Sequence, residues 1–198
     1  MESHARNVQM KFSDYFASVP VLETARCVLR PFERADMDDY FEILQDEEVL
    51  KYLGGAVQVV DREPHISNWL NNINGRLLKV KKVFTWCIEH KETARVIGRI
   101  DLGGFVKQSH AEIAYHFSRD FWGDGIATEV VGCVTDFGVH RLRLHRIQGL
   151  VRVENIASQR VLLKNQYQME GVLKLYPFGK EFHDAAMFAL VKEENLKR

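Results

Sequence analysis

The chain has 198 residues, of which 46% are hydrophobic and 27% are charged, so it is long enough for one domain with a full hydrophobic core. Its 27 Lys and Arg residues balance its 27 Asp and Glu residues, which argues against a nucleic-acid binder that depends on a broad basic face. No apolar run approaches the roughly 20 residues of a membrane span, and no apolar signal core follows Met1, so we expect a cytoplasmic protein without membrane contact.

The cysteine and histidine residues show no spacing that is typical of a metal site. Cys27, Cys87 and Cys133 are odd in number, far apart and without a Cys-x-x-Cys pair, which disfavours both a zinc site and a disulfide framework. Each lies among apolar residues and is expected to be a small buried hydrophobe. The eight histidines contain no His-x-x-x-His pair, so we expect no metal cofactor.

The first half of the chain predicts a strand and two helices. Residues 1–20 have weak periodicity and are expected to form an N-terminal arm before a single domain over 21–198. Alternation over 27–32 predicts a strand. Asp36 is expected to cap a helix whose apolar face comprises Tyr40, Phe41, Ile43 and Leu44. Pro64 precedes a second run at helical spacing, made of Ile66, Trp69, Leu70 and Ile73.

The rest of the chain predicts six more strands and two more helices. Alternating apolar residues predict strands over 83–89, 96–105, 111–117, 146–153, 167–175 and 185–191. The first two of these are expected to form a hairpin. An apolar stripe from Ile126 to Phe137 predicts a long helix, and 155–164 a short one. This order predicts a mixed sheet with helices, in the α/β (α+β) class, and not a pure Rossmann alternation.

A glycine-rich turn separates the strand that ends at Phe117 from the long helix. Glycines allow a ligand to approach the backbone closely, and the first amides of a helix have no partner within it, so such a turn can bind an anion. The sequence lacks the Lys-Ser or Lys-Thr pair of a P-loop and a complete Gly-x-Gly-x-x-Gly pattern. By itself, Gly-x-Gly fits a plain tight turn better. The candidate amide donors are those of Trp122, Gly123, Asp124, Gly125, Ile126, Ala127 and Thr128.

The segments around this turn form an ordered set between about Leu22 and Val191. They are residues 23–32, 96–98, 111–115, 122–129, 155–162, 170–171 and 183–184. In order and spacing this set resembles the GNAT acetyltransferases, and within them the branch that acetylates ribosomal-protein N-termini. The resemblance implies a GNAT fold, with a mixed sheet of six to seven strands, about four flanking helices, and a splay between the fourth and fifth strands, 111–117 and 146–153.

The resemblance also implies a binding mode for acetyl-CoA, with CoA as the product. The pantetheine arm would lie along the splayed strand 111–117 and meet backbone groups of His116, Phe117 and Ser118. The pyrophosphate would occupy the turn 122–128. Asn155 matches a family position that contacts the cofactor arm, although its residue type equally suits a helix N-cap.

Two residues are candidates for moving protons. Ser158 matches a position where relatives in this branch use a serine to protonate or stabilise the CoA thiolate, and Leu162 stands where other GNAT branches have a tyrosine. The alternative for Ser158 is a surface or capping hydroxyl. Glu112, on the same strand face as Ala114 and His116, is a candidate general base; the alternative is a structural carboxylate paired with an arginine. Tyr115 is expected on the opposite face, in the core.

The resemblance implies direct transfer of acetyl from acetyl-CoA to a primary amine in a ternary complex. A protein N-terminal α-amine is the leading acceptor. The alternatives are a small-molecule amine, such as a polyamine, an amino acid or an antibiotic, and a non-catalytic CoA-binding sensor. Pro177 stands where some ribosomal-protein acetyltransferases have a glutamate, which leaves the acceptor open. A homodimer is also left open, since dimers are common in this branch.

Overall fold

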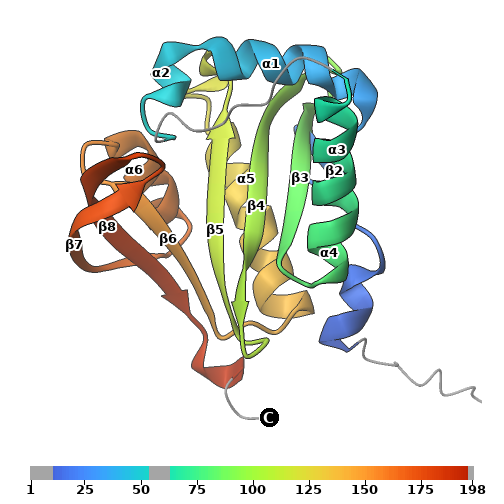
Figure 1. The fold of residues 1–198 in the computed structure, drawn as a ribbon. Coiled ribbons are helices and arrows are strands. Elements are labelled where there is room, and N and C mark those ends of the chain that lie inside the picture. Colours follow the sequence, from blue (N-terminus) through green and yellow to red (C-terminus); the bar gives the residue numbers. More distant parts are fainter. Residues whose placement is uncertain (1–10, 54–62, 196–198) are drawn as a thin grey trace, which may run out of the picture.

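The computed structural model describes residues 11–53 and 63–195 (Figure 1). One mixed sheet has the strand order β1-β2-β3-β4-β5-β6-β8-β7. Every neighbouring pair is antiparallel except β5 and β6, which are parallel. The strands are β1 (Leu22–Glu23), β2 (Cys27–Arg30), β3 (Val83–His90), β4 (Val96–Val106), β5 (His110–Phe117), β6 (Arg146–Arg152), β7 (Gln168–Phe178) and β8 (Glu181–Val191).

Helices cover both faces of this sheet, so the predicted mixed architecture is confirmed. Figure 1 shows α1 across one end of the strands and α3 and α4 along the face opposite α5. The described residues contain eight strands, against the six to seven expected, because the two-residue β1 adds to the edge. The helices are α1 (Met37–Gln45), α2 (Glu47–Leu50), α3 (His65–Asn71), α4 (Leu77–Lys79), α5 (Ile126–Asp136) and α6 (Ile156–Lys164).

Alternation along the strands divides the apolar residues into two cores. The larger core lies between the sheet and α5, where Phe84, Trp86, Ile100, Leu102 and Ile113 meet Val130, Val131 and Val134. The smaller core lies under α1 and α3 and contains Met37, Tyr40, Ile66 and Cys87. Successive side chains of a strand point to opposite faces. The even-numbered residues of β5, among them Glu112 and His116, therefore face away from the α5 core.

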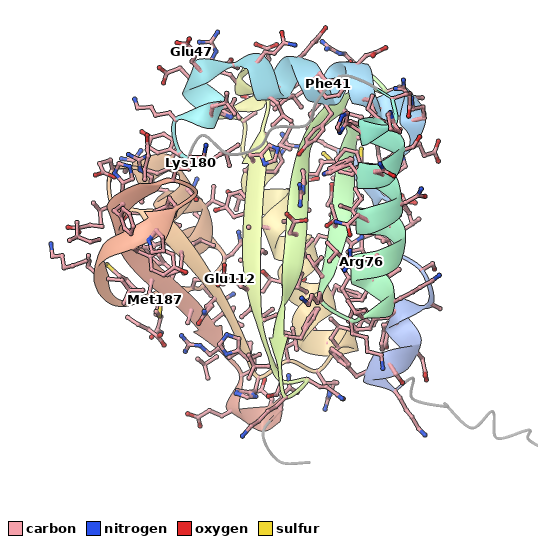
Figure 2. The ribbon with its side chains drawn as sticks, in the orientation of Figure 1. Phe41, Glu47, Arg76, Glu112, Lys180 and Met187 are labelled. Atoms are coloured by element: carbon pink, nitrogen blue, oxygen red, sulfur yellow. The ribbon has the colours of Figure 1, made fainter. Side chains whose placement is uncertain are left out.

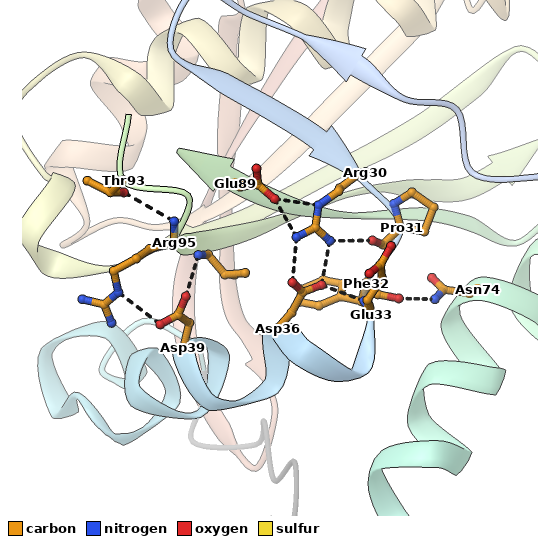
Figure 3. A network of polar contacts seen from close by, with 11 residues as sticks. Arg30, Pro31, Phe32, Glu33, Asp36, Asp39, Asn74, Glu89, Thr93 and Arg95 are labelled. Atoms are coloured by element: carbon orange, nitrogen blue, oxygen red, sulfur yellow. Dashed lines mark hydrogen bonds and ion pairs between the residues drawn. The ribbon is translucent and has the colours of Figure 1, made fainter. Parts of the chain in front are cut away.

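The start of α1 differs from the expectation. Asp36 was expected to cap the helix, but its side chain forms no capping hydrogen bond with α1. Its carboxylate instead accepts two hydrogen bonds of 2.7 Å from the guanidinium of Arg30 and one of 2.6 Å from the amide of Glu33 (Figure 3). Asp36 is buried, and a buried carboxylate is costly unless it is paired, which the guanidinium of Arg30 achieves here.

The described half of the expected N-terminal arm is part of the core. Phe12–Ala17 forms a short 3-10 helix, and the ring of Phe16 stacks on Phe84 with 4.3 Å between centroids. The indole nitrogen of Trp86 donates to the carbonyl of Pro20 at 2.6 Å. The aromatic residues of this short segment anchor it in the core, although its hydrophobic periodicity is weak. Residues 1–10 lie outside the described part of the chain.

The splay expected between strands 111–117 and 146–153 is confirmed between β5 and β6. The two strands pair only from His110 opposite Arg146 to Glu112 opposite Gln148. Beyond this point β6 stays paired with β8 as far as Arg152, whereas β5 continues to Phe117 beside β4. Figure 1 shows β5 and β6 diverging toward the end of the sheet that carries α1 and α2.

Candidate cofactor and acceptor site

The alternation of hydrogen bonds decides which backbone groups of β5 face the splay. The amide of Ser118 donates to the carbonyl of Ile97 at 2.7 Å, so Ser118 faces β4. In an antiparallel ladder the backbone groups of successive residues point to opposite sides, so residues two apart point to the same side. His116, two residues earlier and opposite Arg99, therefore also faces β4, while Phe117 faces the splay.

Of the three residues expected to offer backbone groups to the cofactor arm, His116 and Ser118 face β4 and only Phe117 faces the splay. Both backbone groups of Ser118 are occupied, since its carbonyl accepts from the amide of Phe121 at 3.1 Å. The carbonyl of Phe117 accepts from the indole nitrogen of Trp122 at 3.0 Å, which leaves the Phe117 amide directed at the splay. Ile113 and Tyr115 share the orientation of Phe117, so their backbone groups also face the splay. The sequence analysis did not name these backbone groups, although the period-two pattern of the strand could have identified them.

The glycine-rich turn has the backbone geometry of an anion cradle. Gly123 and Gly125 have φ of +91° and +80°, in the region that favours glycine, and α5 begins at Ile126. A side chain added at Gly123 would meet no atom within 4 Å, so this backbone is open. The Trp122 amide already donates to the carbonyl of Arg119 at 3.0 Å. The donors that remain for an anion are therefore the amides of 123–128, four of which belong to Gly125 and the first turn of α5.

Asn155 and Ser158 lie at the start of α6, beside the splay. The side-chain oxygen of Asn155 accepts from the amide of Ser158 at 3.1 Å, so Asn155 is the N-cap of α6. The hydroxyl of Ser158 lies 2.9 Å from the phenol oxygen of Tyr115, which also donates to the Ser158 carbonyl at 3.2 Å. Burial raises the pKa of Tyr115 to about 12, so the phenol keeps its proton. Sequence reasoning expected Tyr115 only in the core and missed this contact.

Glu112 lies on the other face of the sheet, on the last residue of β5 that still pairs with β6 (Figure 2). Its cross-strand neighbours are Gly103 on β4 and Gln148 on β6. Among the described residues, no ion pair involves Glu112, so the alternative of a carboxylate paired with an arginine finds no partner there. Ala114, two residues further along the same face, is exposed. The carboxylate therefore borders an open part of the sheet surface.

Other polar groups on this face are paired or neutral. Arg99 forms an ion pair of 2.9 Å with Asp101 and lies 5.8 Å over the ring of Trp69. The imidazole of His116 stacks on Tyr40 with 5.7 Å between centroids. Burial, helped by the charge of Arg99, lowers the pKa of His116 to about 3. This imidazole is therefore neutral near pH 7 and a weak base.

Within residues 11–53 and 63–195, no cluster of three or more His, Cys, Asp or Glu side chains could hold a metal ion. In the same ranges no helix is long and apolar enough to cross a membrane. From the sequence, acceptor contacts are expected from the variable segments 50–64, 76–82 and 105–110, and residues 54–62 of the first segment lie outside the described part of the chain.

The sequence matches known acetyltransferases over most of its length. The family model described as "Acetyltransferase (GNAT) domain" matches residues 26–168. The chain is 32% identical over 177 residues to the uncharacterized N-acetyltransferase YoaA of Bacillus subtilis (strain 168), covering 87% of this chain and 97% of the relative. It is 33% identical over 175 residues to the uncharacterized N-acetyltransferase p20 of Bacillus licheniformis, with the same coverage of 87% and 97%.

Solved structures share the fold at lower identity. The ribosomal-protein-S5-alanine acetyltransferase of Vibrio fischeri superposes with a TM-score of 0.78 at 17% identity, over 88% of this chain and 98% of that chain. The spermidine N-acetyltransferase of Vibrio cholerae, solved with CoA and spermine, gives a TM-score of 0.69 at 19% identity, over 87% and 99%.

The structure fits the cofactor of this family. The open turn at Gly123 and Gly125 can receive a pyrophosphate, and the unpaired backbone groups of β5 can receive an extended amide-containing arm. The family model covers well over half of the chain, and two relatives above 30% identity cover most of it. The chain belongs to the GNAT acetyltransferase family and is an acetyl-CoA-dependent N-acetyltransferase.

Proposed function

We propose that this enzyme acetylates a protein N-terminal α-amine at the splay between β5 and β6. The observation that carries the proposal is that a carboxylate and a hydroxyl, those of Glu112 and Ser158, lie on opposite sides of the splay. Glu112 faces the open surface away from α5, and Ser158 lies at the start of α6, joined to Tyr115. An amine can then approach from one side while the thiol departs on the other.

In this arrangement acetyl-CoA supplies an acetyl thioester, and the chain supplies orientation and proton transfer. Glu112 takes a proton from the incoming ammonium, directly or through one water molecule. The amide of Phe117 donates a hydrogen bond to the thioester oxygen as negative charge develops there. The C–N bond forms, the C–S bond breaks, and the hydroxyl of Ser158 gives its proton to the leaving sulfur. Two protons leave the nitrogen in all: Glu112 takes the first from the ammonium and passes it to solvent, and the second is released after the C–N bond has formed and replaces the proton that Ser158 gave to sulfur. One proton is released overall, and the amine attacks the thioester directly without an acyl-enzyme.

The acceptor assignment is supported by the resemblance of the sequence to the ribosomal-protein branch and by the fold shared with the Vibrio fischeri enzyme. The second candidate, a polyamine or other small amine, is supported by the fold shared with the Vibrio cholerae spermidine enzyme at a TM-score of 0.69. The paired Arg99 and Asp101 leave Glu112 as the free carboxylate on the described acceptor face. One carboxylate suits a single ammonium group better than a polycation.

Acetyl-CoA turnover across matched amines tests the proposal. Thiol release is measured with peptides that begin with alanine or serine, with the same peptides blocked at the α-amine but carrying lysine, and with spermidine and free amino acids. We expect the unblocked peptides to have the highest kcat/KM. A higher kcat/KM for spermidine or amino acids would establish the small-molecule alternative. Binding of CoA without turnover of any amine would identify a sensor.

A further inference from the structure

Arg26, in the turn between β1 and β2, reaches across to the glycine-rich turn. Its backbone amide donates to Glu129 Oε1 at 2.9 Å, and its Nε donates to Glu129 Oε2 at 2.8 Å. Its Nη1 donates to the carbonyl oxygen of Asp124 at 2.9 Å. One side chain therefore holds both the loop part of the turn and the first turn of α5. These contacts join residues about a hundred positions apart in the chain.

The contact with Asp124 fixes the direction of a peptide unit. In a planar trans peptide the carbonyl and the following N–H point in opposite directions. Because the Asp124 carbonyl points to Arg26, the amide of Gly125 points away from Arg26. The φ of Gly125, +80°, is part of this geometry, and a Cβ built there would lie 3.8 Å from Arg26 Nη2. The Gly125 amide is thus free to join the first amides of α5 in binding an anion.

The contact between Arg26 and Glu129 offsets a negative charge beside the turn. Glu129 lies in the first turn of α5, where a carboxylate suits the helix dipole but repels a bound pyrophosphate. Burial tends to raise the pKa of Glu129, but hydrogen bonds from Thr24 and Arg26 outweigh it and hold the pKa below its ordinary value. The carboxylate is therefore ionised near pH 7. The guanidinium of Arg26 at 2.8 Å offsets this charge beside the cradle.

We propose that Arg26 is the positioning residue of the pyrophosphate turn: it orients the Gly125 amide toward the cofactor and neutralises Glu129. Arg26 contacts the turn on the side opposite the Gly125 amide, so it acts on the cofactor through the turn and not by direct contact. This inference rests on the proposed place of the pyrophosphate at residues 123–128.

The test compares two thioesters, acetyl-CoA and S-acetylpantetheine, of which only the first has a pyrophosphate. A charged hydrogen bond lost with Arg26→Ala should raise KM for acetyl-CoA roughly 10- to 100-fold, with kcat at saturation little changed. KM for S-acetylpantetheine should stay within about threefold of wild type. Arg26→Lys keeps the charge without the planar fork and should recover only part of the loss.

Lys91→Ala is the matched control, because Lys91 binds Glu23 and the Thr24 carbonyl in the same β1–β2 segment without contacting the turn. It should leave both KM values unchanged. An unchanged acetyl-CoA KM in Arg26→Ala would refute the inference, and so would an equal rise for both thioesters, since that pattern marks general damage. Calorimetric binding of CoA to wild type and to Gly125→Glu separates the two proposals: retained affinity in Gly125→Glu would overturn the pyrophosphate site itself, whatever Arg26→Ala does.

Discussion

The hydroxyl of Tyr115 on β5 lies 2.9 Å from the hydroxyl of Ser158 on α6. This contact joins the strand on one side of the splay to the helix that follows the strand on the other side. Tyr115 also donates to the Ser158 carbonyl, so the Ser158 hydroxyl can in turn donate to Tyr115. The pair holds the serine proton on a defined atom until a stronger acceptor, such as a leaving thiolate, comes within reach.

Replacing Ser158 with alanine tests its role as the proton donor. General acid catalysis is worth roughly 100-fold or more in rate, so Ser158→Ala should lower kcat by about that factor. CoA should still bind with a Kd within about threefold of wild type, because the turn at 122–128 is unchanged. Stopped-flow thiol release gives kcat and calorimetry gives Kd. An unchanged kcat would remove Ser158 from the mechanism.

Tyr115→Phe removes one oxygen and keeps the ring that packs on the core. Without its partner the Ser158 hydroxyl samples several rotamers, and kcat should fall about 10-fold by loss of orientation. The double variant with Ser158→Ala should be no slower than Ser158→Ala alone, since Tyr115 acts through the serine. Additive losses in kcat would mean that Tyr115 acts independently of Ser158.

Gly123→Glu and Gly125→Glu test the pyrophosphate turn. Both positions have positive φ, and a carboxylate there would meet the charge of a pyrophosphate. CoA affinity measured by calorimetry should fall below detection for both. Gly171→Glu is the control, because Gly171 on β7 also has open space around its Cβ position. It should bind CoA as wild type does; CoA affinity retained by the two turn variants would refute the assignment.

Local patterns predicted the elements and the turn, because each depends on neighbouring residues. The spacing of Gly123 and Gly125 before an apolar helical stripe identified the turn, and the resemblance identified the splay. For Asp36 the prediction from local sequence was wrong. Its type and position suit a helix cap, but Arg30 from β2 lies close enough in the fold to bind its carboxylate instead.

The contacts missed by sequence reasoning join distant residues. Tyr115 and Ser158 are 43 positions apart, and Arg26 and Glu129 are 103 apart. Each contact depends on how a helix docks on the sheet, which periodicity within one element does not encode. The orientation of β5 backbone groups was open to prediction, since strand alternation alone directs Phe117 and Tyr115 to the same side.

Glu112→Gln tests the general base through its pH dependence. Gln cannot accept the ammonium proton, so kcat/KM for a peptide should fall roughly 100-fold at pH 7. The α-amine of a peptide has an ordinary pKa of about 8, so above pH 8 the amine loses its proton to solvent and the defect should shrink. Profiles of kcat/KM from pH 6.5 to 9 for both proteins measure this. A defect of constant size at every pH would mean that Glu112 acts as a fixed charge and not as a base.

His116 gives a prediction about stability. Burial and Arg99 lower its pKa from 6.5 to about 3 in the folded chain, so below pH 6.5 the unfolded chain binds a proton that the folded chain excludes. The contribution of the neutral imidazole is full above pH 6.5 and is lost as the pH falls toward 3, at about 1.4 kcal/mol per pH unit. Denaturant unfolding of wild type and His116→Gln at pH 7, 5.5 and 4.5 measures this. His116→Gln starts less stable but should lose free energy of unfolding less steeply with falling pH, because no imidazole titrates at this position; parallel slopes for the two proteins would show that His116 is protonated equally in both states.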